Sequence, residues 1–177
     1  MQAWNDDIYD ALVEANVRQV AFVPDAGHKR LIERCLETPE MRAISLTTEE
    51  EGIALLGGAW LGGDKGVMLM QSSGVGNCIN MLSLTKTCQF PLLMLVTMRG
   101  EWGEFNNWQI PMGRTTQEHL ELCGVSCYRV EKPEEVGETV RTALRYVYYT
   151  NSAVAVLLGQ KLIGAKIFSE GTPEGGK

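Results

Sequence analysis

Short apolar segments alternate with segments of helical periodicity along nearly the whole chain, and this alternation restricts the fold more than any other feature. The expected strands lie at residues 20–23, 43–46, 67–70, 92–96, 126–129 and 153–158. The expected helices lie at residues 5–15, 29–36, 49–61, 78–87, 117–123 and 133–149. Buried strands separated by helices are typical of a parallel sheet that is covered on both faces. The sequence therefore predicts an α/β doubly wound sandwich with a parallel sheet of roughly six strands.

Length and composition indicate a single domain. The chain has 177 residues, of which 45% are hydrophobic, and we expect residues 1–165 to form the domain and residues 166–177 a flexible tail. The net charge of -6 argues against a general nucleic-acid-binding function, because phosphate contacts need a basic surface. No apolar run reaches the ~18 residues of a membrane span. Since the N-terminal segment is acidic and does not resemble a secretory signal, we expect a cytoplasmic protein.

The five cysteines do not follow a metal-binding or disulfide pattern. Their number is odd, no two form a Cys-X-X-Cys pair, and the chain has only two histidines, His28 and His119. Zinc sites and disulfide frameworks have more regular spacing. We therefore expect free, buried thiols in a reducing compartment and no metal site on this chain.

Polar or glycine-rich segments follow four of the expected strands. They lie at residues 24–28, 47–51, 71–77 and 99–115. In an open parallel sheet, ligands bind outside the carboxyl ends of the strands. We therefore expect all four segments to lie at one edge of the sheet and to form the functional site.

Two of these segments have both a structural and a functional interpretation. Glu49, Glu50 and Glu51 can stabilise a helix N-terminus, with Thr47 or Thr48 as the cap. However, the helix that follows is rich in glycine and almost uncharged, which indicates a buried helix with a carboxyl group at its buried end. The glycines of segment 71–77 either form a tight turn or allow backbone N–H groups to approach an anionic ligand.

Together these segments resemble the pyrimidine-binding domains of thiamine-diphosphate enzymes. Glu50, with the small residues after it and the turn Gly58-Ala59-Trp60, is similar to the glutamate signature of that family. Segment 70–80 is similar to a segment of the phosphonopyruvate and sulfopyruvate decarboxylases. Segment 99–113 resembles the alpha subunits of sulfopyruvate decarboxylases most closely. The resemblance extends over residues 5–163.

The resemblance implies the following roles in cofactor binding. Glu50 is the catalytic carboxylate that contacts the aminopyrimidine ring, while Glu49 and Glu51 only cap the helix and face solvent. The expected cofactor-binding residues besides Glu50 are Ser73, Gly74, Gly76 and Asn77. The family also needs a domain with a Gly-Asp-Gly motif that holds Mg2+ and the diphosphate, and this sequence has no such motif. We therefore expect a separate beta subunit to supply that domain.

Other polar residues are candidates for contact with the substrate. Asp25 either handles a proton and contacts substrate or forms an Asx turn, and His28 either shuttles a proton or caps a helix. Arg99 and Arg114 are candidates for binding a sulfonate or phosphonate tail, with an ordinary solvated arginine as the alternative. His119 has a helical, surface-like context and is expected to have no role.

The implied activity is decarboxylation of a 2-keto acid, with 3-sulfopyruvate giving sulfoacetaldehyde and carbon dioxide. Alternatives are phosphonopyruvate as substrate, or a non-catalytic α/β regulatory subunit. Because the cofactor of this family lies between two subunits, we expect at least two alpha and two beta chains. The helix at 49–61 is expected to form part of that interface, and Trp102 and Trp108 either cover the site or contact a partner.

Overall fold

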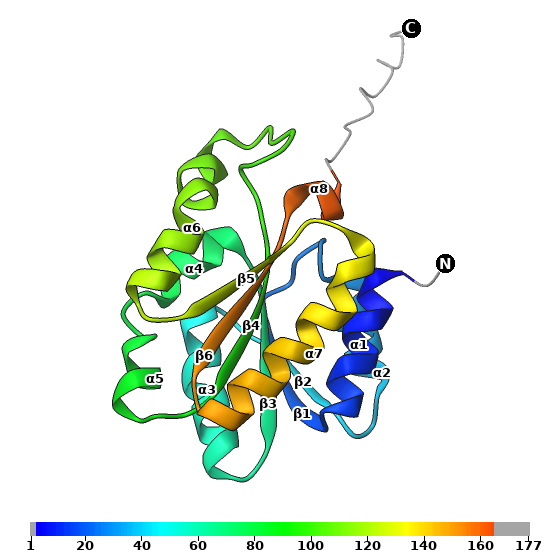
Figure 1. Cartoon of the computed structure of the whole chain (residues 1–177), viewed down its shortest axis with the longest axis vertical. Helices are drawn as coiled ribbons and strands as arrows, with labels where there is room; N and C mark the ends of the chain where they lie inside the picture. Colours follow the sequence, from blue (N-terminus) through cyan, green and yellow to red (C-terminus); the bar gives the residue numbers. More distant parts are fainter. Residues whose placement is uncertain (1–2, 165–177) are drawn as a thin grey trace, which may run out of the picture.

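Six parallel strands form the centre of the protein, as predicted, and helices cover both faces of the sheet (Figure 1). The computed structural model describes residues 3–164. The strands are β1 (Val17–Phe22), β2 (Arg42–Ser45), β3 (Lys65–Gln71), β4 (Leu92–Thr97), β5 (Ser126–Val130) and β6 (Ala153–Leu158). The helices are α1 (Trp4–Glu14), α2 (Lys29–Glu37), α3 (Glu49–Leu61), α4 (Ser72–Cys78), α5 (Ser83–Thr87), α6 (Ile110–Leu122), α7 (Pro133–Thr150) and α8 (Gln160–Ile163). A short 3-10 helix, η1 (Asn107–Gln109), precedes α6.

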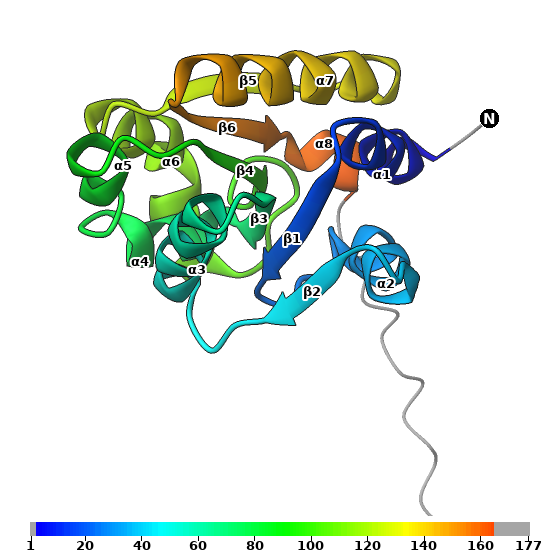
Figure 2. The same cartoon turned by 90° about the horizontal axis from the view of Figure 1, so that it is seen from below.

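The order of the strands creates a crevice at the carboxyl edge of the sheet. The order is β2-β1-β3-β4-β6-β5, and every neighbouring pair is parallel. Figure 2 shows α1, α2 and α7 on one face and α3, α4, α5 and α6 on the other. The chain leaves β1 toward one side of the sheet and β3 toward the other, and such a switch point opens a crevice between the two strand ends.

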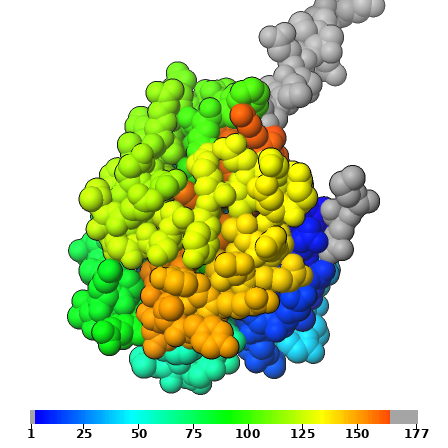
Figure 3. Space-filling view, viewed as in Figure 1, coloured from blue at the N-terminus to red at the C-terminus, as the bar shows by residue number. Residues whose placement is uncertain are grey.

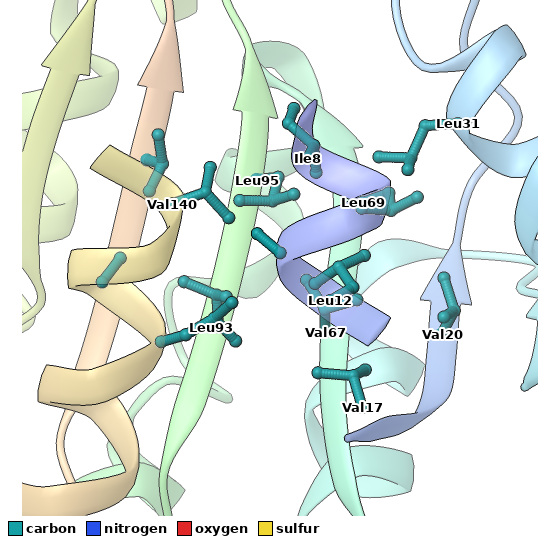
Figure 4. Close-up of a cluster of buried hydrophobic side chains, with 14 of the residues drawn as sticks. Ile8, Leu12, Val17, Val20, Leu31, Val67, Leu69, Leu93, Leu95 and Val140 are labelled. Carbon is teal, nitrogen blue, oxygen red and sulfur yellow. The ribbon is translucent and has the colours of Figure 1, made fainter. Parts of the chain in front are cut away.

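Two apolar clusters, one on each face, hold these layers together. On one face, Ile8 and Leu12 of α1 pack with Leu69 of β3 and Val140 of α7 (Figure 4). On the other face, residues of α3 and α4 pack with the alternate residues of β3 and β4. All six residues of β4 are buried, as expected for a central strand covered on both sides.

Two of the helices differ from the sequence prediction. Helix α4 (Ser72–Cys78) occupies the expected glycine turn directly after β3 and ends where the helix expected at 78–87 should begin, and only the end of that range is helical, as α5 (Ser83–Thr87). The two glycines have poor intrinsic helix propensity, but packing of α4 against α3 and α6 outweighs that preference. Helix α6 starts at Ile110 instead of 117, with Pro111 in its first turn, where proline is favoured.

Three further features are the position of α7, the lack of a membrane-spanning helix between residues 3 and 164, and the extent of the described chain. Helix α7 crosses the face of the molecule seen in Figure 3, where its side chains are yellow to orange. Among the helices between residues 3 and 164, none combines the length and the hydropathy that a membrane span requires. The expected tail at 166–177 and its boundary lie outside the described residues.

Candidate active site

The polar segments that follow β1, β3 and β4 meet at the carboxyl edge of the sheet, as expected. The connection between β4 and α6 lies at the top of Figure 1, together with α8, which follows β6. Helix α3 enters the same region after β2 and packs against α4. Two groups of polar side chains lie at this edge, one around the buried Glu49 and the other around the buried side chain of Asp25.

Glu49 is the carboxylate that the fold buries at the start of α3. Its residue is only 7% exposed, and one carboxylate oxygen accepts a hydrogen bond of 2.8 Å from the side-chain amide of Asn77. A Cβ atom on Gly74 of α4 would overlap the Glu49 carboxyl group, so the glycine leaves the space that this group occupies. Burial, an amide donor and a glycine therefore define a small cradle between α3 and α4.

The expectation that Glu50 is the buried glutamate is wrong, and so is the expectation that Glu49 faces solvent. Glu50 is exposed on the described chain. The buried residues of α3 are Glu49, Gly52, Ile53, Leu56 and Gly57, which share one helical face. Thr48 occupies the cap position without a side-chain hydrogen bond, whereas Glu51 accepts a bond of 2.9 Å from the backbone N–H of Thr47. The capping role expected of Glu51 is therefore confirmed.

Asp25 forms the centre of the second group. One oxygen of its carboxylate accepts hydrogen bonds from the Thr97 hydroxyl at 2.6 Å and from the Gly27 N–H at 3.1 Å. The other oxygen accepts a bond of 3.0 Å from the Arg99 guanidinium, and the two side chains are only 5% and 9% exposed. Burial disfavours the charged form of Asp25. The Thr97 hydrogen bond and the electrostatic effects of His28 and Arg99 outweigh it, so the pKa of Asp25 lies below its ordinary value.

His28 lies beneath this pair and is completely buried. Its Nε2 atom donates a hydrogen bond of 3.0 Å to the backbone carbonyl of Leu95, since a carbonyl oxygen can only accept. It precedes α2 without making a side-chain cap, so the capping interpretation is wrong. Burial lowers the pKa of His28, which keeps the imidazole neutral near pH 7.

The segment after Arg99 is a folded loop and not an irregular stretch. Glu104 accepts hydrogen bonds from the backbone N–H groups of Gly100 and Asn106, and so closes the loop on itself. Gln160 of α8 fastens the loop to the sheet. Its side-chain oxygen accepts bonds of 2.8 and 2.9 Å from the N–H groups of residues 101 and 102, and its amide donates to Glu104 at 3.1 Å.

The other expected site residues are more dispersed. Arg114 is exposed on α6 and lines a separate cavity of about 360 Å3 with Glu101 and Arg129, apart from the Asp25–Arg99 pair. Ser73 is partly buried and Gly76 is exposed on α4. A larger cavity, of about 460 Å3, lies on the other side of the molecule, between α1, α7 and the start of β3, and contains none of the expected site residues.

Comparison with known proteins decides the family. A family model described as "Thiamine pyrophosphate enzyme, N-terminal TPP binding domain" matches residues 3–118, which is more than half of the chain. The chain belongs to this family. Thiamine pyrophosphate is the same compound as thiamine diphosphate, so the resemblance seen in the sequence is confirmed. The matched segment contains Glu49, Asp25 and Arg99, but not Gln160.

Two decarboxylases are among the proteins of similar sequence. The chain is 38% identical over 151 residues to "Sulfopyruvate decarboxylase subunit alpha" of Methanocaldococcus jannaschii, covering 85% of this chain and 89% of that protein. It is 39% identical over 119 residues to "Phosphonopyruvate decarboxylase" of Streptomyces viridochromogenes, covering 66% of this chain and 30% of that protein. A 2-oxoglutarate:ferredoxin oxidoreductase from Magnetococcus marinus has the same fold. Its TM-score is 0.71 at 15% identity, over 92% of this chain and 29% of that chain.

Sequence reasoning missed several residues of the site. The signal for Glu49 was present, because it lies three and four positions before Gly52 and Ile53 on the buried face of α3. Thr97 and Gln160 gave no comparable signal. A threonine at the end of an apolar strand and a glutamine after a glycine are common, and only their partners make them distinctive.

Proposed function

We propose that this chain is the alpha subunit of a thiamine-diphosphate-dependent decarboxylase that converts 3-sulfopyruvate to sulfoacetaldehyde and carbon dioxide. The observation that carries the proposal is the match to a named alpha subunit over most of both chains, 85% of this one and 89% of the relative. The cradle around Glu49 and the buried Asp25–Arg99 pair give the fold two polar groups at the edge where open parallel sheets bind their ligands.

The buried carboxylate and the amide of the cradle between α3 and α4 are polar groups of the kind that the aminopyrimidine ring of the cofactor would need. A carboxylate beside an amide can accept one hydrogen bond from a ring N–H while the amide contacts a neighbouring group. When bound, thiamine diphosphate supplies the carbon nucleophile and the electron sink of the reaction. We propose that Glu49, and not Glu50, holds a proton at the ring nitrogen, because Glu49 is the glutamate that α3 turns toward Asn77 and Gly74.

Asp25 and Arg99 are the proposed substrate-side groups. The Nε atom of Arg99 is buried and has no hydrogen-bond partner within residues 3–164, so one donor of the guanidinium remains for an anionic ligand. A carboxylate or sulfonate oxygen of the substrate is the kind of acceptor that an arginine binds well. Arg114 is exposed in its separate cavity and is the weaker candidate for this contact.

We further propose that a beta subunit supplies the diphosphate- and Mg2+-binding domain, in an assembly of at least two alpha and two beta chains in the cytoplasm. The exposed face of α3 supports an interface there. Leu61 is 89% exposed, and a Cβ atom on Gly58 would meet nothing within 4 Å, which leaves room for another chain to approach closely. Native mass spectrometry of the co-purified subunits tests the stoichiometry.

Phosphonopyruvate is the second candidate substrate. The identity of 39% to a phosphonopyruvate decarboxylase is as high as that to the alpha subunit, although the match covers only 30% of that protein. A phosphonate carries more negative charge than a sulfonate and would need more cationic groups. The described part of the site offers one buried arginine, which favours the sulfonate.

The test is aldehyde formation by the chain co-expressed with its beta partner, given thiamine diphosphate and Mg2+. Sulfopyruvate and phosphonopyruvate are run side by side. We expect turnover of sulfopyruvate that is absent without the partner. Turnover of phosphonopyruvate alone would replace the proposed substrate, and no turnover together with no bound cofactor would favour a regulatory subunit.

Neighbouring glutamates provide the matched control. Glu49→Gln keeps the size of the side chain and removes its charge, and we expect it to lower kcat by about 100-fold or more, the usual range for loss of a proton-handling group. Glu50→Gln makes the same change one position along the helix, and we expect it to keep most of the activity. If Glu50→Gln lowers kcat and Glu49→Gln does not, Glu50 is the glutamate that contacts the cofactor ring.

A further inference from the structure

Thr97 is an unusual residue at the end of an otherwise apolar strand. It is the last residue of β4, its side chain is completely buried, and the five residues before it are all hydrophobic. A hydroxyl group in such a place needs a partner, because an unpaired buried donor is costly. The Thr97 hydroxyl lies 2.6 Å from the Asp25 carboxylate and 3.4 Å from the carbonyl oxygen of Met70. Since it has only one proton to donate, the shorter contact identifies Asp25 as the acceptor.

The surroundings of this hydrogen bond are closely packed. A Cβ atom on Gly27 would lie 2.8 Å from the Thr97 methyl carbon and 2.9 Å from the Asp25 oxygen, so only glycine allows the three residues to approach. With Thr97, the Gly27 N–H and Arg99, Asp25 accepts three hydrogen bonds. An ionised carboxylate can accept about four, so three of its acceptor positions are occupied. Hydrogen bonds to a charged acceptor are stronger than those to a neutral one, and one of these donors is the Arg99 cation, so the surroundings favour the ionised form.

We propose that Thr97 is a positioning residue of the active site, whose hydroxyl holds Asp25 as an oriented carboxylate paired with Arg99. Asp25 then acts near pH 7 as a fixed negative charge and a hydrogen-bond acceptor, and not as a proton donor. This inference rests on the proposed decarboxylase function. It adds a residue whose contact with the substrate is indirect, since Thr97 acts through Asp25.

The charges around Asp25 are consistent with this role. Arg99 faces it from the β4–α6 connection, and His28 faces it from the start of α2 with a pKa that burial lowers. Lys29 and Glu33 of α2 line the same surface depression and lie 3.8 Å apart, so they balance each other near the rim. The pKa of Asp25 lies below its ordinary value, and its ionised form therefore stabilises the fold at neutral pH. That contribution is lost as the pH falls through the folded pKa.

The first readout measures Asp25 directly and needs no activity. The side-chain carboxyl carbon of Asp25 is titrated by NMR in the full chain, in the wild type, Thr97→Val and Thr97→Ser. Valine has the shape of threonine without the hydroxyl, and we expect it to raise the pKa of Asp25 by about one to two units, the usual effect of losing a hydrogen bond to a charged group. Serine keeps the hydroxyl and should restore the wild-type titration. An unchanged titration in Thr97→Val would overturn the proposal.

The second readout is the pH dependence of kcat/KM in the complex with the beta subunit. We expect the acidic limb of the profile to move to higher pH in Thr97→Val by the same amount, and to return in Thr97→Ser. Thr116→Val is the matched control, because Thr116 is also completely buried but donates its hydroxyl to the Met112 carbonyl within α6. If the pKa of Asp25 shifts in Thr97→Val but the kcat/KM profile does not move, the charge of Asp25 does not matter for turnover and the active-site role of Thr97 is overturned. No turnover by the wild-type complex would refute the proposed function, and the NMR titration would still decide the coupling.

Discussion

Gly74→Ala tests whether the Glu49 carboxyl group occupies the space beside Gly74, apart from any effect of the substitution on the helix propensity of α4. Alanine normally stabilises a helix relative to glycine, by up to about 1 kcal/mol. At Gly74, however, the added methyl group would overlap the Glu49 carboxyl, which must swing away and lose its hydrogen bond from Asn77. A hydrogen bond to a charged group contributes about 1.5–3 kcal/mol. We therefore expect a net loss of about 0.5–2 kcal/mol in the free energy of unfolding.

Gly76→Ala is the matched control for stability. It makes the same change two residues along the same helix, where the nearest atom to the new Cβ is the Met112 sulfur at 3.4 Å, the end of a flexible side chain. We expect it to raise the free energy of unfolding by up to about 1 kcal/mol. The free energies of unfolding of the two variants, measured with urea on the full chain, should therefore differ by about 1.5–3 kcal/mol, the contribution of the lost hydrogen bond.

A double-mutant cycle then identifies the cause. In a Glu49→Ala background the space beside Gly74 is empty, so Gly74→Ala should become neutral or stabilising. The reasoning is refuted if Gly74→Ala stabilises the wild type as much as Gly76→Ala does, because the carboxyl group then does not occupy the cradle. It is also refuted if the loss at Gly74 persists after Glu49 is shortened.

Two further predictions concern the loop and the thiols. Gln160→Ala should speed amide hydrogen exchange at residues 101 and 102, because their N–H groups lose their acceptor. It should also lower kcat/KM of the complex, because the loop carries Arg99. The control Gln117→Ala loses only a surface bond to Glu121 and should leave both quantities unchanged. Cys88 should react first with iodoacetamide because it is the one exposed thiol of the five. Burial raises the pKa of Cys35 and of Cys78 to about 12 and should protect both thiols until the chain unfolds. Peptide mass spectrometry of the labelled chain measures the order of reaction.

Local patterns in the sequence were sufficient to predict the layers of the fold. Helix α3 has the predicted bounds, 49–61, and the strands differ from their predicted bounds by only a few residues, because apolar runs in a parallel sheet are buried on both faces and leave a strong pattern. The starts of α4 and α6 were harder to predict. In both cases a segment with only a weak helical pattern forms a helix because it packs on neighbouring helices, and a short stretch of sequence does not contain that information.

The sequence by itself determined the parallel sheet and the edge at which the polar segments gather, since both follow from residue types and their spacing along the chain. Similarity to known sequences determined the family. Only the tertiary structure decided which glutamate is buried and which residues hold Asp25. The rotation of α3 against the sheet turns Glu49 inward and Glu50 outward, and sheet pairing places Thr97 beside a carboxylate 72 residues earlier in the chain. Contacts of this kind depend on close packing between segments that are distant in the sequence, and they cannot be predicted from a local sequence pattern.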